Sequence, residues 1–334
     1  MELQQRHVAV LMGGTSLEHD ISMASGAKVA ESLDKTKYRV TWIVIGKDGL
    51  WHFPGIPPMD AFDAVGEIKR LGVDCAFVAL HGPFGEDGRL QGMLDLLGIP
   101  YTCSGCAASA LAMDKIRCKA VVAGAGVRVA RHVTFFLPEW QHASEAVTAE
   151  VAESVGFPCV VKTPCQGSSF GMAIPRTADE FSACVGGILA VDGTAMAEEY
   201  IKGTEVTCAV LDVEAGRRAR ALPVTEIRPV TSTYFDFEAK YTPGATREIT
   251  PAEIPAEVAG HVQEMAVMAH EAVGCGIWSR SDFIIGAQGP VWIEVNTVPG
   301  MTPTSLYPQA AAAVGIKFDQ LMNMFVEAAL RRRS

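Results

Sequence analysis

The first hundred residues alternate between short apolar runs and stretches whose apolar positions recur every three or four residues. Three apolar runs predict strands at residues 7–12, 38–45 and 75–80. The stretches between them predict two helices, one with apolar positions at Ile21, Ala24, Val29 and Leu33 and one near residues 60–70. Strands that alternate with helices predict a parallel α/β sheet, whose loops after Met12 and Leu80 are the expected ligand-facing edge.

The rest of the chain combines helices, short strands and a hairpin. Apolar spacing predicts a single helix over about 107–122, which Gly124 and Gly126 end. Further elements are predicted as strands at 160–162, 196–200 and 205–213, helices near 178–190, 257–273 and 317–332, and a hairpin over 279–296. Residues 228–255 are predicted to be irregular, with four prolines, and a loop of this length is usually functional.

The polar residues of the predicted hairpin share strand faces. Arg280 and Asp282 are two positions apart, as are Glu294 and Asn296, so each pair lies on one face. A five-residue turn ending at Pro290 sets Asp282 opposite Glu294, and the same register sets Arg280 opposite Asn296. Two carboxylates and an amide oxygen suit Mg²⁺ that bridges phosphates, and a solvated ion pair is the alternative. The apolar neighbours favour the metal site, because isolated carboxylates need a partner there.

Three glycine-containing loops follow predicted strands. Residues 13–16 predict a tight corner between strand and helix, beside which Glu18 could meet a cationic group. Lys162 precedes a loop over 167–171 whose backbone N–H groups could cradle phosphate, although a flexible surface loop is equally consistent. Residues 81–88 begin with a histidine and could serve a site or cap a helix. The sequence has neither G-x-G-x-x-G nor a P-loop motif, which argues against a dehydrogenase.

Composition limits the classes of protein. The 334 residues predict two domains or three small ones, and 49% hydrophobic with 20% charged residues excludes a disordered chain. With 38 acidic residues and 28 Lys plus Arg the net charge is −10, which argues against a nucleic-acid partner. A few well-placed lysines can still bind a small phosphate compound. Two cationic loops, an oxygen-rich hairpin and a long loop therefore predict a nucleoside-triphosphate enzyme outside the P-loop and kinase classes.

Cysteine usage and hydropathy bear on the compartment. Nine cysteines, an odd number, predict reduced thiols and a cytoplasmic location. Cys103 and Cys106 have C-x-x-C spacing, which we interpret as part of a small-residue loop because no second pair or nearby histidine accompanies them. The uncharged stretch 295–316 holds three prolines, so we expect no membrane-spanning helix.

Nine segments in a fixed order carry a resemblance. They are GGTSLEHDIS (13–22), HGPFGEDG (81–88), GIPYT (98–102), ALAMDK (110–115), GSSFGM (167–172), EYIKGTE (199–205), YFDFEAKY (234–241), RSD (280–282) and EVNTVPGMTPTSL (294–306). With these segments in register, the sequence resembles the D-alanine–D-alanine ligase family of the ATP-grasp superfamily. Two departures are the intervening Thr163–Gln166 segment after Lys162 and EVNT in place of the usual EANT, whose change should point away from the metals.

The resemblance implies a fold and a reaction. The fold class is α/β, with α+β in the ATP-binding part: a Rossmann-like parallel sheet over 1–103, a central ATP-grasp subdomain with a Gly/Ser flap over 104–197, and a C-terminal subdomain with metal site and lid over 198–334. ATP would phosphorylate one D-alanine and the amine of a second would attack, for peptidoglycan precursors. The resemblance implies two Mg²⁺, with Mn²⁺ as a substitute, small-molecule substrates and a homodimer. Charge and hydropathy argue against nucleic acid and a membrane as partners.

The resemblance also assigns roles to residues of this sequence. The ATP-binding set is Lys115, Lys162, Ser169, Glu198, Glu199, Ile201, Glu205 and Lys240, of which Lys240 would meet the γ-phosphate. The metal ligands would be Asp282, Glu294 and Asn296. The amino-acid site would comprise Glu18 at the ammonium group, His81 at the carboxylate, Arg280 at the oxyanion, and Gly300, Ser305 and Leu306 at the second substrate. The linked catalytic set would be Glu18, Ser168 and Tyr241, with Arg280.

Three rivals to this reading remain open. A depsipeptide ligase would use D-lactate as second substrate, but the intact EAKY around Tyr241 favours the dipeptide. Another amino-acid ligase of the ATP-grasp superfamily is the second rival. A catalytically silent homologue would act as a binding protein, but the presence of the predicted lysines, Arg280 and the carboxylates argues against it.

Overall fold

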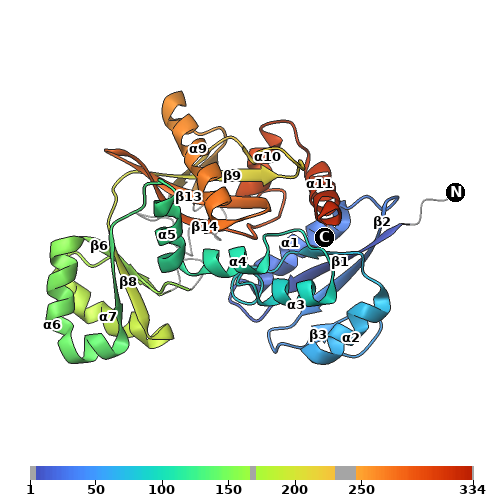
Figure 1. The fold of residues 1–334 in the computed structure, drawn as a ribbon, viewed down its shortest axis with the longest axis horizontal. Coiled ribbons are helices and arrows are strands. Elements are labelled where there is room, and N and C mark those ends of the chain that lie inside the picture. The colour runs from blue at the N-terminus through green and yellow to red at the C-terminus, as the bar shows by residue number, and fades with distance from the viewer. Residues whose placement is uncertain (1–4, 166–170, 230–245, 333–334) are drawn as a thin grey trace.

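The computed structural model describes residues 5–165, 171–229 and 246–332. Within these residues the strands form an N-terminal, a central and a C-terminal sheet. Figure 1 shows the N-terminal sheet on the right, the C-terminal sheet in the middle and the central sheet at lower left. The predicted site residues Ser168, Ser169, Lys240 and Tyr241 lie outside the described residues, so their roles stay predictions.

The long strands of the N-terminal sheet are parallel, as predicted. In spatial order the strands are β3 Trp51–His52, β2 Tyr38–Ile45, β1 Arg6–Gly13 and β4 Cys75–Val78. β1 pairs in parallel with β2 and β4, whereas the short β3, which was not predicted, pairs antiparallel with β2. The helices of this part are α1 His19–Ser32, α2 Ala61–Leu71 and α3 Arg89–Leu97. β1 is buried after its first residue, as expected of an inner strand.

The corner between β1 and α1 depends on glycine. Gly13 has a φ of 90°, and a Cβ added there would lie 2.3 Å from the carbonyl oxygen of Ile45. Ser22 fixes the corner from α1, because its buried Oγ accepts a hydrogen bond from Gly13 N (2.8 Å) and donates one to Ala79 O (2.6 Å). The predicted tight corner is therefore present, and it directs the start of α1 toward the carboxyl ends of the strands.

The central sheet is antiparallel. In spatial order its strands are β5 His132–Phe136, β8 Thr194–Glu199, β6 Cys159–Lys162 and β7 Met172–Ala173. Two helices, α6 Leu137–Ser154 and α7 Ala178–Asp192, cover it and bury Val147, Val151, Phe181 and Val185 against its strands. The predictions of β6, β8 and α7 are confirmed. β5 and α6 were not predicted; α6 starts with Pro138 in its first turn, where proline is tolerated.

The C-terminal sheet is also antiparallel. Its main path is β12 Thr246–Ile249, β11 Thr225–Pro229, β9 Thr204–Asp212, β13 Ile277–Gly286 and β14 Gly289–Asn296, and β10 Arg220–Ala221 pairs with β9. The accompanying helices are α9 Ala256–Val273, α10 Leu306–Ala312 and α11 Phe318–Arg331. The prediction that 228–255 is irregular throughout was wrong, because β12 pairs with β11 through Glu226 and Ile249.

The single helix predicted over 107–122 is two helices, α4 Cys106–Met113 and α5 Lys115–Gly124. Asp114 separates them in an extended conformation, and its carboxylate accepts a hydrogen bond from Arg117 N at 3.0 Å. Aspartate competes for backbone donors in this way and favours helix starts over helix interiors. The consequence is that Lys115 opens a helix. The buried face of α5 joins the C-terminal core around α9 and β14.

The hairpin has the predicted pairs but a different turn. Asp282 lies opposite Glu294 and Arg280 opposite Asn296, as predicted. The five-residue turn was wrong, since Gly286 pairs with Gly289 and Pro290 lies within β14. A register shift after Asp282 compensates for the shorter turn and restores the predicted pairs. Pro290 is tolerated because β14 is an edge strand of the main path.

An aromatic cluster joins the N-terminal and C-terminal sheets. Phe325 of α11 stacks on Trp278 of β13, with the two ring centroids 4.9 Å apart. Its ring centroid also lies 5.9 Å from that of Tyr307 and 6.5 Å from that of Phe77 of β4. These residues belong to one continuous hydrophobic core. The packing fixes how the two sheets lie relative to each other. The domain boundaries proposed from the sequence stay predictions.

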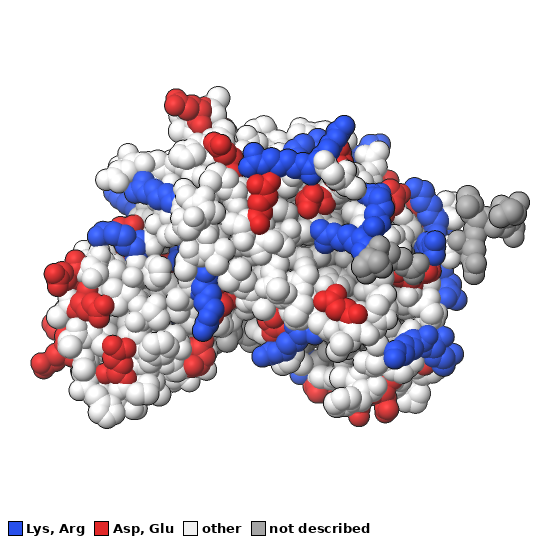
Figure 2. All heavy atoms as spheres, viewed as in Figure 1, with Lys and Arg blue, Asp and Glu red and all other residues white. Residues whose placement is uncertain are grey.

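Charged side chains of both signs are interspersed on the face shown in Figure 2. All nine cysteines lie among the described residues and are free thiols. Among the described residues no helix is both long and apolar enough to cross a membrane.

Candidate active site

The hairpin brings the predicted metal ligands together. Arg280 binds Asp282 through two hydrogen bonds of 2.9 Å, and Asn296 Nδ2 donates to the same carboxylate at 3.3 Å. Thr207 of the neighbouring β9 donates to Asp282 Oδ1 at 2.7 Å. On the opposite strand, Glu294 forms an ion pair with Lys115 of α5. Both carboxylates are therefore held in place by neighbouring strands and a helix.

This donor set fits a hard divalent cation. Asp282, Glu294 and Asn296 supply carboxylate and amide oxygens, and Mg²⁺ is typically held by one or two carboxylates together with substrate phosphates. A group of three or more His, Cys, Asp or Glu side chains suited to a metal is absent from the described part of the chain. The protein oxygens therefore suit a metal whose remaining ligands come from a phosphate-bearing substrate.

Two predicted phosphate-binding lysines flank this hairpin. Lys115 opens α5 and pairs with Glu294 at 3.2 Å, and Lys162 ends β6. The backbone N of Lys115 donates to the carbonyl of Pro164 at 3.2 Å, so the segment that departs from the family pattern lies against the start of α5. The side chains of Lys115 and Lys162 are each only 11% exposed. A nucleotide phosphate would thus meet partly desolvated cations, whose attraction is stronger than at the surface.

Glu198 of β8 lies between two lysines. Its carboxylate pairs with Lys162 Nζ at 2.5 Å through Oε2 and with Lys119 Nζ at 2.7 Å through Oε1. Burial raises the pKa of Glu198, but the two ammonium groups outweigh burial and lower this pKa to about 2. The predicted adenine-facing carboxylate is therefore ionised and buried.

The other hinge residues occupy distinct positions. Glu199 turns to Arg131, whose Nε donates to it at 2.9 Å. Ile201 packs against the hairpin end, because a Cβ added to Gly286 would lie 2.9 Å from Ile201 Cγ2. Glu205 lies on β9 opposite Ile284 of β13. Four of the predicted nucleotide residues, Glu198, Glu199, Ile201 and Glu205, thus lie along the connection from the end of β8 to the start of β9.

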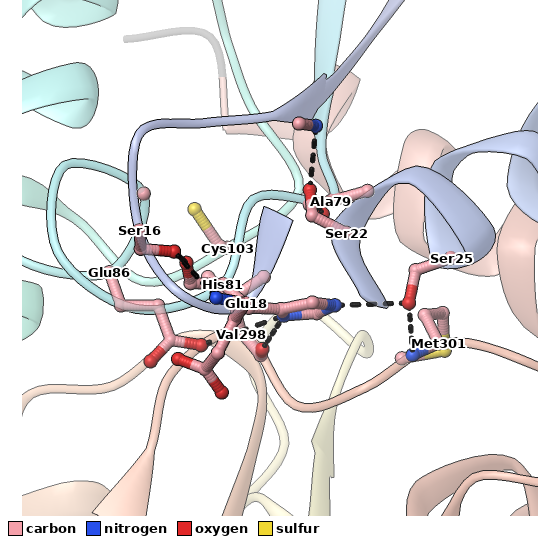
Figure 3. Close-up of polar contacts among 12 residues, drawn as sticks. Ser16, Glu18, Ser22, Ser25, Ala79, His81, Glu86, Cys103, Val298 and Met301 are labelled. Atoms are coloured by element: carbon pink, nitrogen blue, oxygen red, sulfur yellow. Dashed lines mark hydrogen bonds and ion pairs between the residues drawn. The ribbon is translucent and has the colours of Figure 1, made fainter. Parts of the chain in front are cut away.

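The residues predicted to bind the first amino acid lie at the carboxyl edge of the N-terminal sheet (Figure 3). Glu18 precedes α1, and Gly82, with a φ of 74°, leaves room for it: an added Cβ would lie 2.6 Å from Glu18 Oε2. His81 Nδ1 donates to Val298 O at 2.8 Å, and Ser25 Oγ lies 3.0 Å from His81 Nε2. His81 therefore links α1 to the segment that follows the hairpin.

Glu86 was not predicted, and it connects this edge to the hairpin. Its carboxylate lies 3.7 Å from His81 Nδ1 and interacts electrostatically with Glu18 and Arg280. The pKa of Glu86 is raised to about 7 by the sum of several effects. Burial and the like charge of Glu18 raise this pKa, and the interaction with His81 lowers it. Glu86 thus lies between Glu18 and His81 on one side and Arg280 of the hairpin on the other.

The predicted second-substrate residues lie together. Ser305 Oγ accepts a hydrogen bond from Thr302 N at 3.1 Å, and a Cβ on Gly300 would come within 3.2 Å of the same oxygen. Leu306 begins α10 and is 9% exposed. Ser25 also accepts from Met301 N at 3.1 Å, which ties this loop to α1.

Sequence reasoning missed Lys119, Ser25 and Glu86. Lys119 is one turn after Lys115 in an apolar stretch, so it gave a usable signal, because a lysine on the buried face of a helix needs a partner. Glu86 is part of the recognised 81–88 segment but was not singled out. Ser25 gave no signal, since its role depends on the tertiary position of His81.

Known proteins match over nearly the whole chain. The family models described as D-ala D-ala ligase N-terminus and C-terminus match residues 7–104 and 121–327. The D-alanine–D-alanine ligase of Halalkalibacterium halodurans is 40% identical, covering 97% of this chain and 99% of its own, and that of Chelativorans sp. is 41% identical, covering 97% and 98%.

Solved structures agree with these matches. The VanG D-Ala:D-Ser ligase from Enterococcus faecalis superposes with a TM-score of 0.83 at 31% identity, covering 98% of this chain and 100% of its own. The D-alanine–D-alanine ligase from Bacillus anthracis complexed with ATP has a TM-score of 0.80 at 31% identity, with 98% of each chain covered. The chain therefore belongs to the D-alanine–D-alanine ligase family.

Proposed function

We propose that this protein joins two D-alanines to D-alanyl-D-alanine at the expense of ATP, through a D-alanyl phosphate. The curated relatives of similar length carry this activity in their names, and one solved relative binds ATP. The observation that carries the proposal is the position of Arg280. Asp282, a predicted metal ligand, holds its guanidinium group on the hairpin, and Glu86, next to Glu18 and His81, interacts with it. Arg280 therefore lies between the residues proposed for the phosphates and those proposed for the first D-alanine.

In the first step the carboxylate of one D-alanine attacks the γ-phosphorus of ATP, a carboxyl O–P bond forms and ADP leaves. Lys115 and Lys162 would hold phosphate oxygens, and Glu18 would bind the substrate ammonium group. Asp282, Glu294 and Asn296 would hold Mg²⁺, or Mn²⁺ in its place, which neutralises charge on the transferred phosphoryl group. Flap and lid roles for Ser168, Ser169, Lys240 and Tyr241 fall outside the described residues and stay predictions.

In the second step the amine of the other D-alanine, after losing a proton, attacks the acyl carbon, and the tetrahedral intermediate expels phosphate. Arg280 would stabilise the oxyanion from a strand position that needs little reorganisation. His81 is 4% exposed and uses both ring nitrogens within the protein. We therefore infer that His81 helps the first substrate by fixing the edge around Glu18.

The second substrate is the point at which relatives differ. The similarity to a D-Ala:D-Ser ligase makes D-serine the second candidate for the site around Ser305 and Leu306. The test is ATP-dependent phosphate release with D-alanine alone and with D-alanine plus D-serine or D-lactate, with product masses. D-Alanyl-D-alanine as main product supports the proposal. Turnover confined to a mixed product, or absent with D-alanine, overturns it.

The family resemblance further supports a homodimer and a cytoplasmic setting, the latter consistent with nine free thiols. Light scattering on the purified chain tests the assembly, and a monomer at micromolar concentration would contradict the dimer.

A further inference from the structure

Lys119 is a buried charge that the proposed reaction does not use. It lies on α5 one turn after Lys115, and its side chain is 0% exposed. Its ammonium group pairs with Glu198 at 2.7 Å and lies 5.5 Å from the ring centre of Trp292. Lysines are almost never fully buried without a partner, because removing the charge from water costs free energy. A fully buried lysine at this position therefore indicates a specific role.

The neighbouring charges do not cancel. Two lysines, Lys119 and Lys162, face the one carboxylate of Glu198, so these three side chains carry 2 − 1 = +1. They are between 0% and 11% exposed. A positive charge in so dry a place favours an anionic ligand.

The two lysines at Glu198 differ in reach. Lys162 ends β6 with an 11% exposed side chain, whereas Lys119 is enclosed by α5, β8 and β14. If Lys162 turned to a phosphate and nothing else neutralised Glu198, a buried carboxylate would lose its charge partner. Lys119 removes that obstacle, because it stays with Oε1 when Oε2 is released.

We propose that Lys119 is a positioning residue of the nucleotide site: it keeps Glu198 ionised and oriented while Lys162 transfers from Glu198 to a nucleotide phosphate. The inference rests on the proposed ATP-dependent function. Trp292 supports the arrangement, since its ring faces the ammonium group and its Nε1 donates to Ser281 Oγ at 3.2 Å, next to Asp282. Lys115, which pairs with the predicted metal ligand Glu294, thus lies one helical turn before Lys119, which pairs with the predicted adenine-facing Glu198.

The test replaces Lys119 by methionine, which has similar length and no charge. Binding of Mg-ADP and Mg-ATP to the purified full chain is titrated by calorimetry, and kcat and KM are measured for ATP, ITP and D-alanine. We expect nucleotide affinity to fall by about ten- to a hundredfold, by analogy with the loss of metal affinity when a residue that orients a metal ligand is replaced. KM for D-alanine should change less than twofold, and the preference for ATP over ITP should shrink. Lys69→Met, on the exposed face of α2, should leave all values unchanged.

A second variant guards against misfolding. Glu198→Gln/Lys119→Met removes both charges, and deleting a buried pair is tolerated better than deleting one partner. Relative to Glu198→Gln alone, the double variant should show no further loss of nucleotide affinity. Equal nucleotide affinity of wild type and Lys119→Met would overturn the inference, as would parallel losses for ATP and D-alanine. Failure of the wild type itself to bind Mg-ADP would instead overturn the proposed function.

Discussion

Replacing Glu86 by glutamine should change the pH dependence of stability. The substitution keeps the shape of the side chain and removes its titration. The pKa of Glu86 rises from 4.5 to about 7 mainly because of burial, while His81, Glu18 and Arg280 face it from the surrounding elements. In the folded protein this carboxyl therefore binds its proton more tightly than in the unfolded chain.

The sign follows from proton linkage. Between pH 4.5 and about 7 the folded state binds more protons at Glu86 than the unfolded state, so the free energy of unfolding of the wild type falls as pH rises. At about 1.4 kcal/mol for each pKa unit, the shift corresponds to an upper limit of about 3 kcal/mol. The side chain is 14% exposed, so partial solvation reduces this value.

Urea unfolding at pH 5, 6, 7 and 8 measures the effect. The unfolding free energy of Glu86→Gln minus that of the wild type should rise by about 2 to 3 kcal/mol from pH 5 to pH 8. Glu31→Gln is the matched control, because Glu31 is exposed and the Lys28 ammonium group lowers its pKa, so it titrates below this window. A difference that stays flat or falls with pH would refute the reasoning for Glu86.

Three further substitutions test the described contacts. Ser25→Ala should destabilise the protein by about 1–3 kcal/mol, because the buried Met301 N–H loses its acceptor, and thermal unfolding measures this. Glu294→Gln should abolish Mg-ATP turnover with unchanged circular dichroism; wild-type activity would contradict the metal assignment. Phe325→Ala should cost about 3–5 kcal/mol in urea unfolding, because the ring stacked on Trp278 is fully buried; a loss below 1 kcal/mol would contradict the bridging role of α11.

Local periodicity was enough for much of the fold. The strand predicted over 38–45 has the same bounds in the structure, and the hairpin pairing of Asp282 with Glu294 follows from alternation along strands. The turn was wrong because a bulge changes the count of residues without changing the polar pairs. The prediction of a single helix over 107–122 was wrong because Asp114 can start a new helix as readily as it can lie within one.

The site was less accessible from the sequence than the fold. Most of its carboxylates and lysines could be named, Lys119 and Glu86 excepted, but the partners at Glu198 could not. Glu198, Lys162 and Lys119 come from three different elements. Glu86 could not be recognised for the same reason. From the sequence, a glutamate in a glycine-rich loop is expected to be solvent-exposed, and only tertiary packing buries it and raises its pKa to about 7. Pairwise charge contacts of this kind are not encoded in periodicity.

The separation of the hydrophobic cores indicates which contacts nucleotide binding can change. The N-terminal and C-terminal sheets share a core through Phe325, and the hydrogen bonds of His81 and Ser25 cross the same boundary. The central sheet has a core of its own around Phe181. The described ion pairs of Lys119 and Lys162 with Glu198 lie where that sheet meets α5. Because a side chain such as Lys162 exchanges ion-pair partners more easily than packed cores separate, we expect nucleotide binding to move Lys162 away from Glu198, to leave Lys119 on Glu198, and to leave the core shared by the N-terminal and C-terminal sheets in place.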